Sequence, residues 1–185
     1  MSATIAGVFV GGAGARMGGA AKGLLLAPGG GTLVERWRTL LQSAGVEVLL
    51  VGRHPSYATL GFEVLDDDPA GIGPLGGLVA LLRRAGDRHA LALACDMPFV
   101  SPSLVGRLIA APPAVVVAPR RDDRWEPLCA RYDARRVLPH AVARVASGRY
   151  SLQRLLDDAA ATALPLEPGE ADELHDWDTL ADLRS

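Results

Sequence analysis

Apolar residues along the chain fall into short continuous runs, and helix-like segments separate these runs. The runs predict strands at Thr4–Val10, Glu47–Val51, Phe62–Leu65, His89–Ala94 and Ala114–Ala118. The segments between them predict helices at Leu33–Ser43, Pro74–Arg84 and Pro102–Ala111. Apolar runs without alternation are typical of strands covered on both faces, and strands that alternate with helices form crossover units. The pattern therefore predicts a three-layer α/β/α fold with a mainly parallel sheet.

Local signals place the helix ends. Thr32 suits the N-cap of the first helix, and Pro74 and Pro102 suit the first turns of the next two. The pattern loosens after residue 119. There it predicts a strand at Trp125–Tyr132, helices at Arg136–Ala146 and Ser151–Asp157, and a late strand at Ala161–Leu166.

Composition limits the class of protein. The 185 residues predict a single domain over 1–185, and a hydrophobic content of 49% is enough for a substantial core. A net charge of −2 argues against electrostatic binding of nucleic acid. The first residues lack the features of a signal peptide, and no apolar run is long enough to span a bilayer, so we expect a cytoplasmic protein without membrane contact. The two cysteines have no CxxC spacing, which argues against a cysteine zinc site.

Lysine is nearly absent from the chain. Lysine and arginine together number 19, and Lys22 is the only lysine among them. Either this is chance, or position 22 needs a compact, flexible point charge that the planar arginine fork does not supply.

Arginines also gather late in the chain, where Pro119–Arg154 holds nine arginines against four acids. This local excess indicates either a solvated surface or a site for an anionic acceptor.

A glycine-rich segment follows the first strand, beginning at Gly11-Gly12. Glycines let backbone N–H groups approach phosphate closely, which predicts phosphate binding at the end of this strand. The segment is not a Walker loop, because Lys22 is followed by Gly23 and not by Ser or Thr. A dinucleotide fingerprint survives only with loosened spacing, although Arg53 would suit a 2′-phosphate. An NADP-dependent reductase is therefore a weaker alternative.

A third kind of loop matches in both residues and spacing. It has the pattern Gly-Gly-x-x-x-Arg-Met-Gly followed by a lysine, which this chain provides as Gly11-Gly12 to Arg16-Met17-Gly18 and Lys22. On this motif the chain resembles the MobA-like NTP transferases, the family of the molybdenum cofactor guanylyltransferases. Further segments fit the resemblance in the same order along the chain: Asp66-Asp67-Asp68, Gly73-Pro74-Leu75-Gly76-Gly77, Cys95-Asp96-Met97-Pro98-Phe99, Glu126-Pro127-Leu128 and Asp178–Leu183.

The chemistry of nucleotidyl transfer gives several of these residues a role. Asp96 follows a buried strand, where a hard carboxylate is a natural Mg²⁺ ligand. Mg²⁺ on Asp96, with Lys22 and Arg16, would neutralise charge on the reacting phosphates. These three residues are the predicted catalytic set.

The resemblance implies the remaining roles. Phe9, Val10, Gly11 and Gly12 would lie along the nucleotide, Lys22 would contact it, and Asp67 would help bind the guanosine. The implied reaction transfers GMP from GTP to the molybdopterin cofactor. Molybdoenzymes or cofactor chaperones would be contacts of such a protein.

Three departures from the family pattern leave alternatives open. Gly52 stands where guanylyltransferases tend to have asparagine, and Asp176 and Asp178 replace two asparagines. The aspartates resemble the cytidylyltransferase branch, where one can be a second metal ligand. The same reaction with CTP, a related small-molecule nucleotidyltransferase and a degenerate nucleotide-binding regulator therefore remain candidates.

Overall fold

A computed structural model describes residues 4–11 and 21–177 of the chain. Its helices, in chain order, are α1 (Leu33–Ser43), α2 (Pro74–Ala85), α3 (Pro102–Ala110), α4 (Ala134–Ala146), α5 (Leu152–Asp158) and α6 (Glu170–Glu173), with 3₁₀ turns at η2 (Lys22–Leu24) and η3 (Pro55–Tyr57). Its strands are β1 (Thr4–Phe9), β2 (Glu47–Val51), β3 (Glu63–Leu65), β4 (His89–Ala94), β5 (Val116–Arg121), β6 (Arg124–Trp125), β7 (Cys129–Asp133) and β8 (Thr162–Leu164).

The strands of the described residues form one sheet in the order β3-β2-β1-β4-β7-β5-β6, and β8 pairs with β5. The β1–β2, β1–β4, β2–β3 and β5–β8 pairs are parallel. Strand β7 runs antiparallel to β4 and β5, and β6 runs antiparallel to β5. The predicted α/β fold with a mainly parallel sheet is confirmed.

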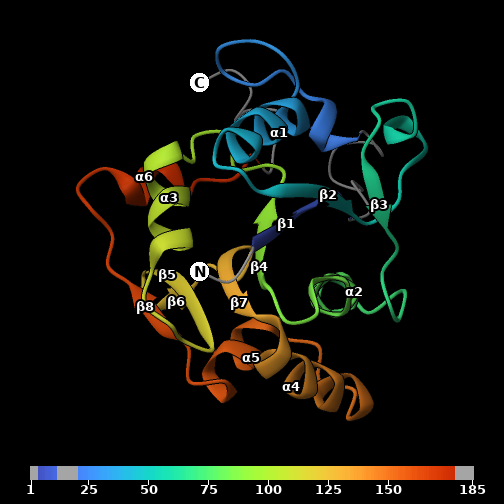
Figure 1. Cartoon of the computed structure of the whole chain (residues 1–185), viewed down its shortest axis with the longest axis vertical. Coiled ribbons are helices and arrows are strands. Elements are labelled where there is room, and N and C mark those ends of the chain that lie inside the picture. The colour runs from blue at the N-terminus through green and yellow to red at the C-terminus, as the bar shows by residue number, and fades with distance from the viewer. Residues whose placement is uncertain (1–3, 12–20, 178–185) are drawn as a thin grey trace.

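Helices cover both faces of this sheet, with α1 and α3 on one side and α2, α4 and α5 on the other (Figure 1). Alternate residues of each central strand enter different cores. In β1, Ile5 and Phe9 pack with α2, whereas Ala6 and Val8 pack with α1 and α3. A strand buried on both sides has no polar face, which explains why these strands read as continuous apolar runs.

The predicted helix starts are confirmed by local bonds. Thr32 caps α1 in a reciprocal capping box with Glu35. Ser101 caps α3 by accepting from the N–H of Leu104, with Pro102 in the first turn. Helix α2 begins with Pro74 after Gly73, whose φ of 73° suits glycine.

The predicted strand at Trp125–Tyr132 is wrong in one respect, because the structure divides it into β6 and β7. A turn at residues 126–128 separates the two, closed by a bond of 3.0 Å from the Cys129 N–H to the Glu126 carbonyl. Pro127 has no N–H to give to a strand ladder, so the chain turns there. The short elements η2, η3 and α6 were not predicted, since one turn of helix has too few residues to show a period.

The chain reverses its direction of winding between β1 and β4. From β1 it passes through α1 to β2 and β3, and it reaches β4 on the other side of β1 only after α2. Phe9 and Ala94, the last residues of β1 and β4, are paired in register. In open α/β sheets ligands bind at such a point, outside the carboxyl ends of the strands. The residues after Phe9 and Ala94 are therefore where we expect a ligand to bind.

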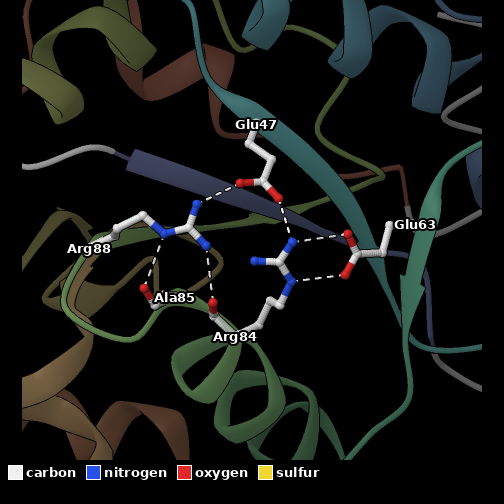
Figure 2. Close-up of polar contacts among 5 residues, drawn as sticks. All are labelled: Glu47, Glu63, Arg84, Ala85 and Arg88. Carbon is white, nitrogen blue, oxygen red and sulfur yellow. Dashed lines mark hydrogen bonds and ion pairs between the residues drawn. The ribbon is translucent and has the colours of Figure 1, made fainter.

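A cluster of charged side chains lies at the opposite edge, where β2 and β3 begin (Figure 2). Arg84, near the end of α2, places Nη2 2.7 Å from Glu47 and Nε 2.9 Å from Glu63. Arg88 donates to Glu47 at 2.5 Å and also to the carbonyls of Arg84 and Ala85. This amino-edge cluster ties the end of α2 to the first residues of β2 and β3.

Candidate functional site

Lys22 and Asp96 meet at the carboxyl edge of the sheet. The Lys22 ammonium lies 2.9 Å from Oδ2 of Asp96, and the two side chains are only 21% and 19% exposed. Lys22 begins the turn η2, and Asp96 follows β4 by two residues. The structure thus brings together two of the three predicted catalytic residues, which are 74 positions apart in the sequence.

Tight packing of the next residue fixes the backbone of Lys22. A Cβ on Gly23 would lie 2.6 Å from Cγ1 of Val34, so only glycine fits there. The Gly23 N–H donates to the hydroxyl of Tyr57 at 3.1 Å, and Tyr57 is buried. Burial raises the pKa of this phenol to about 12, so it stays protonated near neutral pH. Tyr57 was not predicted as a site residue, and its place in the single turn η3 gives no sequence signal of this contact.

Three backbone bonds hold the loop that carries Asp96. The Cys95 N–H donates to the carbonyl of Phe9 at 3.1 Å, and the Ala94 N–H donates to the carbonyl of Leu128 at 2.7 Å. The Trp177 N–H donates to the carbonyl of Asp96 at 2.9 Å. Residues from three distant parts of the chain therefore converge on this loop. Cys95 itself is packing, because burial raises its pKa to about 12 and keeps the thiol neutral.

Trp177 also connects the two loops. Its ring packs in a small apolar cluster with Ala27 and Leu33, just after the Lys22 turn. Phe99 meets it edge-on, with ring centroids 6.0 Å apart. Trp177 is thus part of the packing that joins the Lys22 turn to the Asp96 loop.

The first residues of the glycine loop use their N–H groups within the sheet edge. Val10 and Gly11 donate to the carbonyl of Val51, at 2.9 and 3.2 Å. Phe9 is 7% exposed, so its ring belongs to the core. A phosphate would therefore have to meet N–H groups beyond Gly11. Gly12 and Arg16, which were also predicted, lie outside the described residues, as does Asp178.

Gly52 touches the glycine loop directly. Its φ is +94°, and a Cβ there would lie 2.6 Å from the Cα of Gly11. The two backbones are too close for any side chain at position 52. The absence of asparagine at this position therefore has a local cause in this chain.

The three consecutive aspartates have different surroundings. Asp66 forms a two-point pair with Arg53, at 2.6 and 2.7 Å, and Asp68 pairs with Arg83. Asp67 instead lies against the first turn of α2, where its Oδ1 is 3.0 Å from the position of a Cβ on Gly77. Burial, and then the charge of Asp66, raise the pKa of Asp67. A partly buried carboxylate next to a helix start is well placed to accept N–H groups of a ligand.

The late arginines do not form one basic surface. Arg131 is buried and donates to the carbonyls of Ile109, Ala111 and Pro112, and Arg144 is buried against Asp158. Arg121 and Arg124 line a cavity of about 670 Å³ with Trp125, Glu126, Asp172 and Asp176, among others. Two of these arginines are therefore bound to partners inside the fold, and the two that line the cavity are mixed with acids.

The residues present suit a magnesium ion that takes most of its ligands from phosphate and water. Asp96 supplies a hard carboxylate at the strand end, and among the described residues no three His, Cys, Asp or Glu side chains gather around a common point. Mg²⁺ is commonly held by one or two carboxylates together with substrate phosphates. Asp96 would therefore suit such an ion as its protein ligand.

Comparison with known proteins gives one consistent result. A family model described as the MobA-like NTP transferase domain matches residues 6–163. A molybdenum cofactor guanylyltransferase from Xanthomonas euvesicatoria pv. vesicatoria is 36% identical over 146 residues, which cover 77% of this chain and 72% of that protein. Another from Pseudomonas syringae pv. syringae is 31% identical over 174 residues, which cover 88% and 83%. Alignments with further proteins of that name are shorter and cover 44% to 61% of them.

A solved structure agrees with these matches. Molybdopterin-guanine dinucleotide biosynthesis protein A from Archaeoglobus fulgidus superposes with a TM-score of 0.76 at 25% identity, over 97% of this chain and 94% of that one. No helix within the described ranges is both long and apolar enough to cross a bilayer.

Proposed function

Because the chain belongs to the MobA-like NTP transferase family and is a nucleotidyltransferase, we propose that it transfers GMP from GTP to the molybdopterin cofactor. The products are the guanine dinucleotide form of the cofactor and pyrophosphate. The observation that carries this proposal is the contact between Lys22 and Asp96 at the point where the sheet reverses its winding. In this proposal Lys22 supplies a positive charge on a flexible side chain for phosphate, and Asp96 supplies a carboxylate for magnesium.

The proposed reaction is a single displacement at phosphorus. An oxygen of the acceptor phosphate forms a bond to the α-phosphorus. The bond from this phosphorus to the oxygen bridging to the β-phosphorus breaks, and its electron pair leaves with pyrophosphate. The attacking phosphate is already anionic, so the site needs no general base. Catalysis then rests on positioning and on stabilisation of charge.

The chain's own residues divide these tasks. Lys22 turns from Asp96 to the triphosphate and stabilises the negative charge that develops on the leaving group. Asp96, once released from Lys22, would hold a magnesium ion, which would supply positive charge at the reacting phosphates. Arg16 is proposed as a second positive charge on the phosphates. Asp67, beside the start of α2, accepts from the N–H groups of guanine.

Transfer from CTP to the same acceptor is the second candidate. The observation in its favour is that Gly52 cannot carry a side chain to read the base, since its backbone lies against Gly11. Selection of guanine then depends on Asp67 and on the backbone around it.

The test measures pyrophosphate release from GTP, CTP, ATP and UTP with magnesium, with and without the molybdopterin cofactor. Release from GTP that requires both the cofactor and magnesium is the expected result. Release from CTP alone would move the protein to the cytidylyl reaction. No release from any of the four, by protein that is folded in thermal unfolding, would contradict the proposed function.

A further inference from the structure

We propose that Glu126 recognises the pterin of the acceptor, by accepting hydrogen bonds from the 2-amino group and the adjacent ring N–H of a 2-amino-4-oxopteridine. This inference rests on the proposed function, since it identifies where the acceptor of that reaction binds. It concerns the cavity lined by Arg121, Arg124, Trp125, Glu126, Asp172 and Asp176. We call it the β6 cavity, because Arg124 and Trp125 form strand β6.

The β6 cavity adjoins the Lys22–Asp96 pair through direct backbone links. Asp176 lines the cavity, and the N–H of the next residue, Trp177, donates to the carbonyl of Asp96. On the other wall, the turn that carries Glu126 continues to Leu128, whose carbonyl accepts from Ala94 at the end of β4. A ligand in this cavity would therefore lie beside the loop that holds Asp96.

The wall around Glu126 is held rigidly. The Glu126 N–H donates to the carbonyl of Pro119 at 3.0 Å. The side-chain amide of Gln153 binds the backbone of Trp125, the residue before Glu126. It accepts from the Trp125 N–H at 3.0 Å and donates to the Trp125 carbonyl at 2.7 Å. The indole N–H of Trp125 donates to Asp157 at 2.9 Å. A fixed backbone on both sides gives the carboxylate a defined direction, which two-point recognition requires.

The Glu126 carboxylate keeps the capacity to accept further bonds. Its side chain is 16% exposed, and Oε1 lies 3.3 Å from Nε of Arg121. This distance is long for a charge-assisted bond, and an ionised carboxylate has about four acceptor positions. Burial raises the pKa of Glu126, and Arg121 opposes this shift. A carboxylate held out of water in a cavity wall gains from a ligand with two parallel N–H donors.

The other charges select the part of the acceptor that enters. Asp122, Glu126, Asp172 and Asp176 outnumber Arg121 and Arg124 among the lining residues. The net negative charge of the lining would repel a phosphate, whereas it would not repel a neutral ring that is rich in N–H donors. The pterin ring therefore suits the β6 cavity, and the acceptor phosphate then points toward Lys22.

Guanine presents the same donor edge as a pterin, so the test must separate the two. Asp67 lies on the β3 side of the Lys22–Asp96 pair, and Glu126 lies on the β7 side. We therefore assign Asp67 to guanine and Glu126 to pterin. The experiment measures binding of 6-hydroxymethylpterin and of 6-hydroxymethyllumazine, in which an oxo group replaces the 2-amino group. It also measures binding of GTP and of ITP, in which hydrogen replaces the 2-amino group. The proteins are the wild type, Glu126→Gln, Asp67→Asn and the control Asp123→Asn, an exposed aspartate on the same hairpin that does not line the cavity.

We expect wild-type protein to prefer the pterin over the lumazine by about tenfold or more, the usual effect of a lost charge-assisted bond. Glu126→Gln should remove this preference and leave the ratio of GTP to ITP affinity unchanged. Asp67→Asn should lower the ratio of GTP to ITP affinity and leave the pterin preference unchanged. Asp123→Asn should change neither the pterin preference nor the ratio of GTP to ITP affinity. In the transfer assay, Glu126→Gln should raise the KM for the molybdopterin cofactor and leave the KM for GTP unchanged.

Three results would overturn the inference. One is wild-type protein that binds neither pteridine or binds both equally. Another is Glu126→Gln with an unchanged pterin preference, and the third is Glu126→Gln that alters only the ratio of GTP to ITP. Each can occur while the wild type still transfers GMP to the cofactor, so the proposed function would stand. Loss of all cofactor-dependent pyrophosphate release by the wild type would instead remove the proposed function.

Discussion

The two edges of the sheet hold opposite charges in contact, but in different ways. At the amino edge, Arg84 and Arg88 each make several bonds to Glu47, Glu63 and nearby carbonyls (Figure 2). At the carboxyl edge, a lysine meets Asp96 through one nitrogen and one oxygen. The planar arginine fork suits bonds that stay in place, whereas an ammonium on a flexible stem can exchange partners. The amino-edge cluster therefore ties helix α2 to the sheet, whereas the carboxyl edge carries the pair proposed to act in turnover.

The largest expected effect is at the carboxyl edge, in Asp96→Asn. We expect kcat to fall by about a thousandfold, because an amide does not replace the carboxylate that holds magnesium. Magnesium-dependent pyrophosphate release measures this. Glu63→Gln, the same change at the amino edge, is the control and should leave kcat unaltered. An Asp96→Asn enzyme with ordinary turnover at ordinary magnesium concentrations would rule out the metal role.

Lys22→Ala should weaken GTP binding by about a hundredfold, the effect of losing a charge-assisted contact with phosphate. Lys22→Arg should recover little of the lost GTP affinity, because the planar guanidinium group cannot exchange carboxylate for phosphate as the ammonium group does. Isothermal titration gives the affinity, and thermal unfolding should show that both variants remain folded. Unchanged GTP affinity in Lys22→Ala would end the assignment of Lys22 to the triphosphate.

Gly23→Ala tests whether Lys22 depends on the packing beneath it. The new methyl group would lie 2.6 Å from Val34 and 2.9 Å from the Tyr57 hydroxyl, so the turn must shift. We expect a loss of about 1–3 kcal/mol in the free energy of unfolding, together with a higher KM for GTP. Urea unfolding and initial rates measure these quantities. Gly106→Ala is the matched control, because a Cβ there meets no atom within 4 Å. A Gly23→Ala enzyme with wild-type stability and KM would show that the turn tolerates the shift.

The smallest effect belongs to the amino-edge cluster. The Arg84 guanidinium lowers the pKa of Glu63, so this pair stabilises the fold above the normal glutamate pKa and loses its contribution as pH falls through the lowered one. Glu63→Gln should cost about 0.5–1 kcal/mol near neutral pH, and this cost should shrink as the pH is lowered below the normal glutamate pKa. Urea unfolding at neutral pH and at a series of lower pH values checks the difference. An equal cost at every pH would mean that the ion pair contributes nothing.

The sequence predicted the sheet well because the physics there is local. Apolar runs between helix signals give β1, β2 and β4, and the helix-start signals Thr32 and Pro102 depend only on neighbouring residues. The approach of Lys22 to Asp96 also follows in outline, since both come after parallel strands that end at one edge.

Other features depend on long-range packing and leave no local signal. Arg131 reads as a charged surface residue, yet it is buried and binds carbonyls at and after the end of α3. Tyr57 supports the Lys22 turn across 34 positions of sequence. Glu126 was recognised as part of a motif, but only the folded chain places it in a cavity wall.

The contact between Gly11 and Gly52 constrains how this enzyme can change over time. Main chain lies against main chain there, and a Cβ at position 52 would come within 2.6 Å of Gly11. A single substitution at position 52 thus cannot add a base-reading side chain without moving the loop. A new nucleotide preference would then arise elsewhere, for example at Asp67, which is proposed to bind guanine. The close contact of Gly11 with Gly52 therefore limits which single substitutions can change the nucleotide that the enzyme uses.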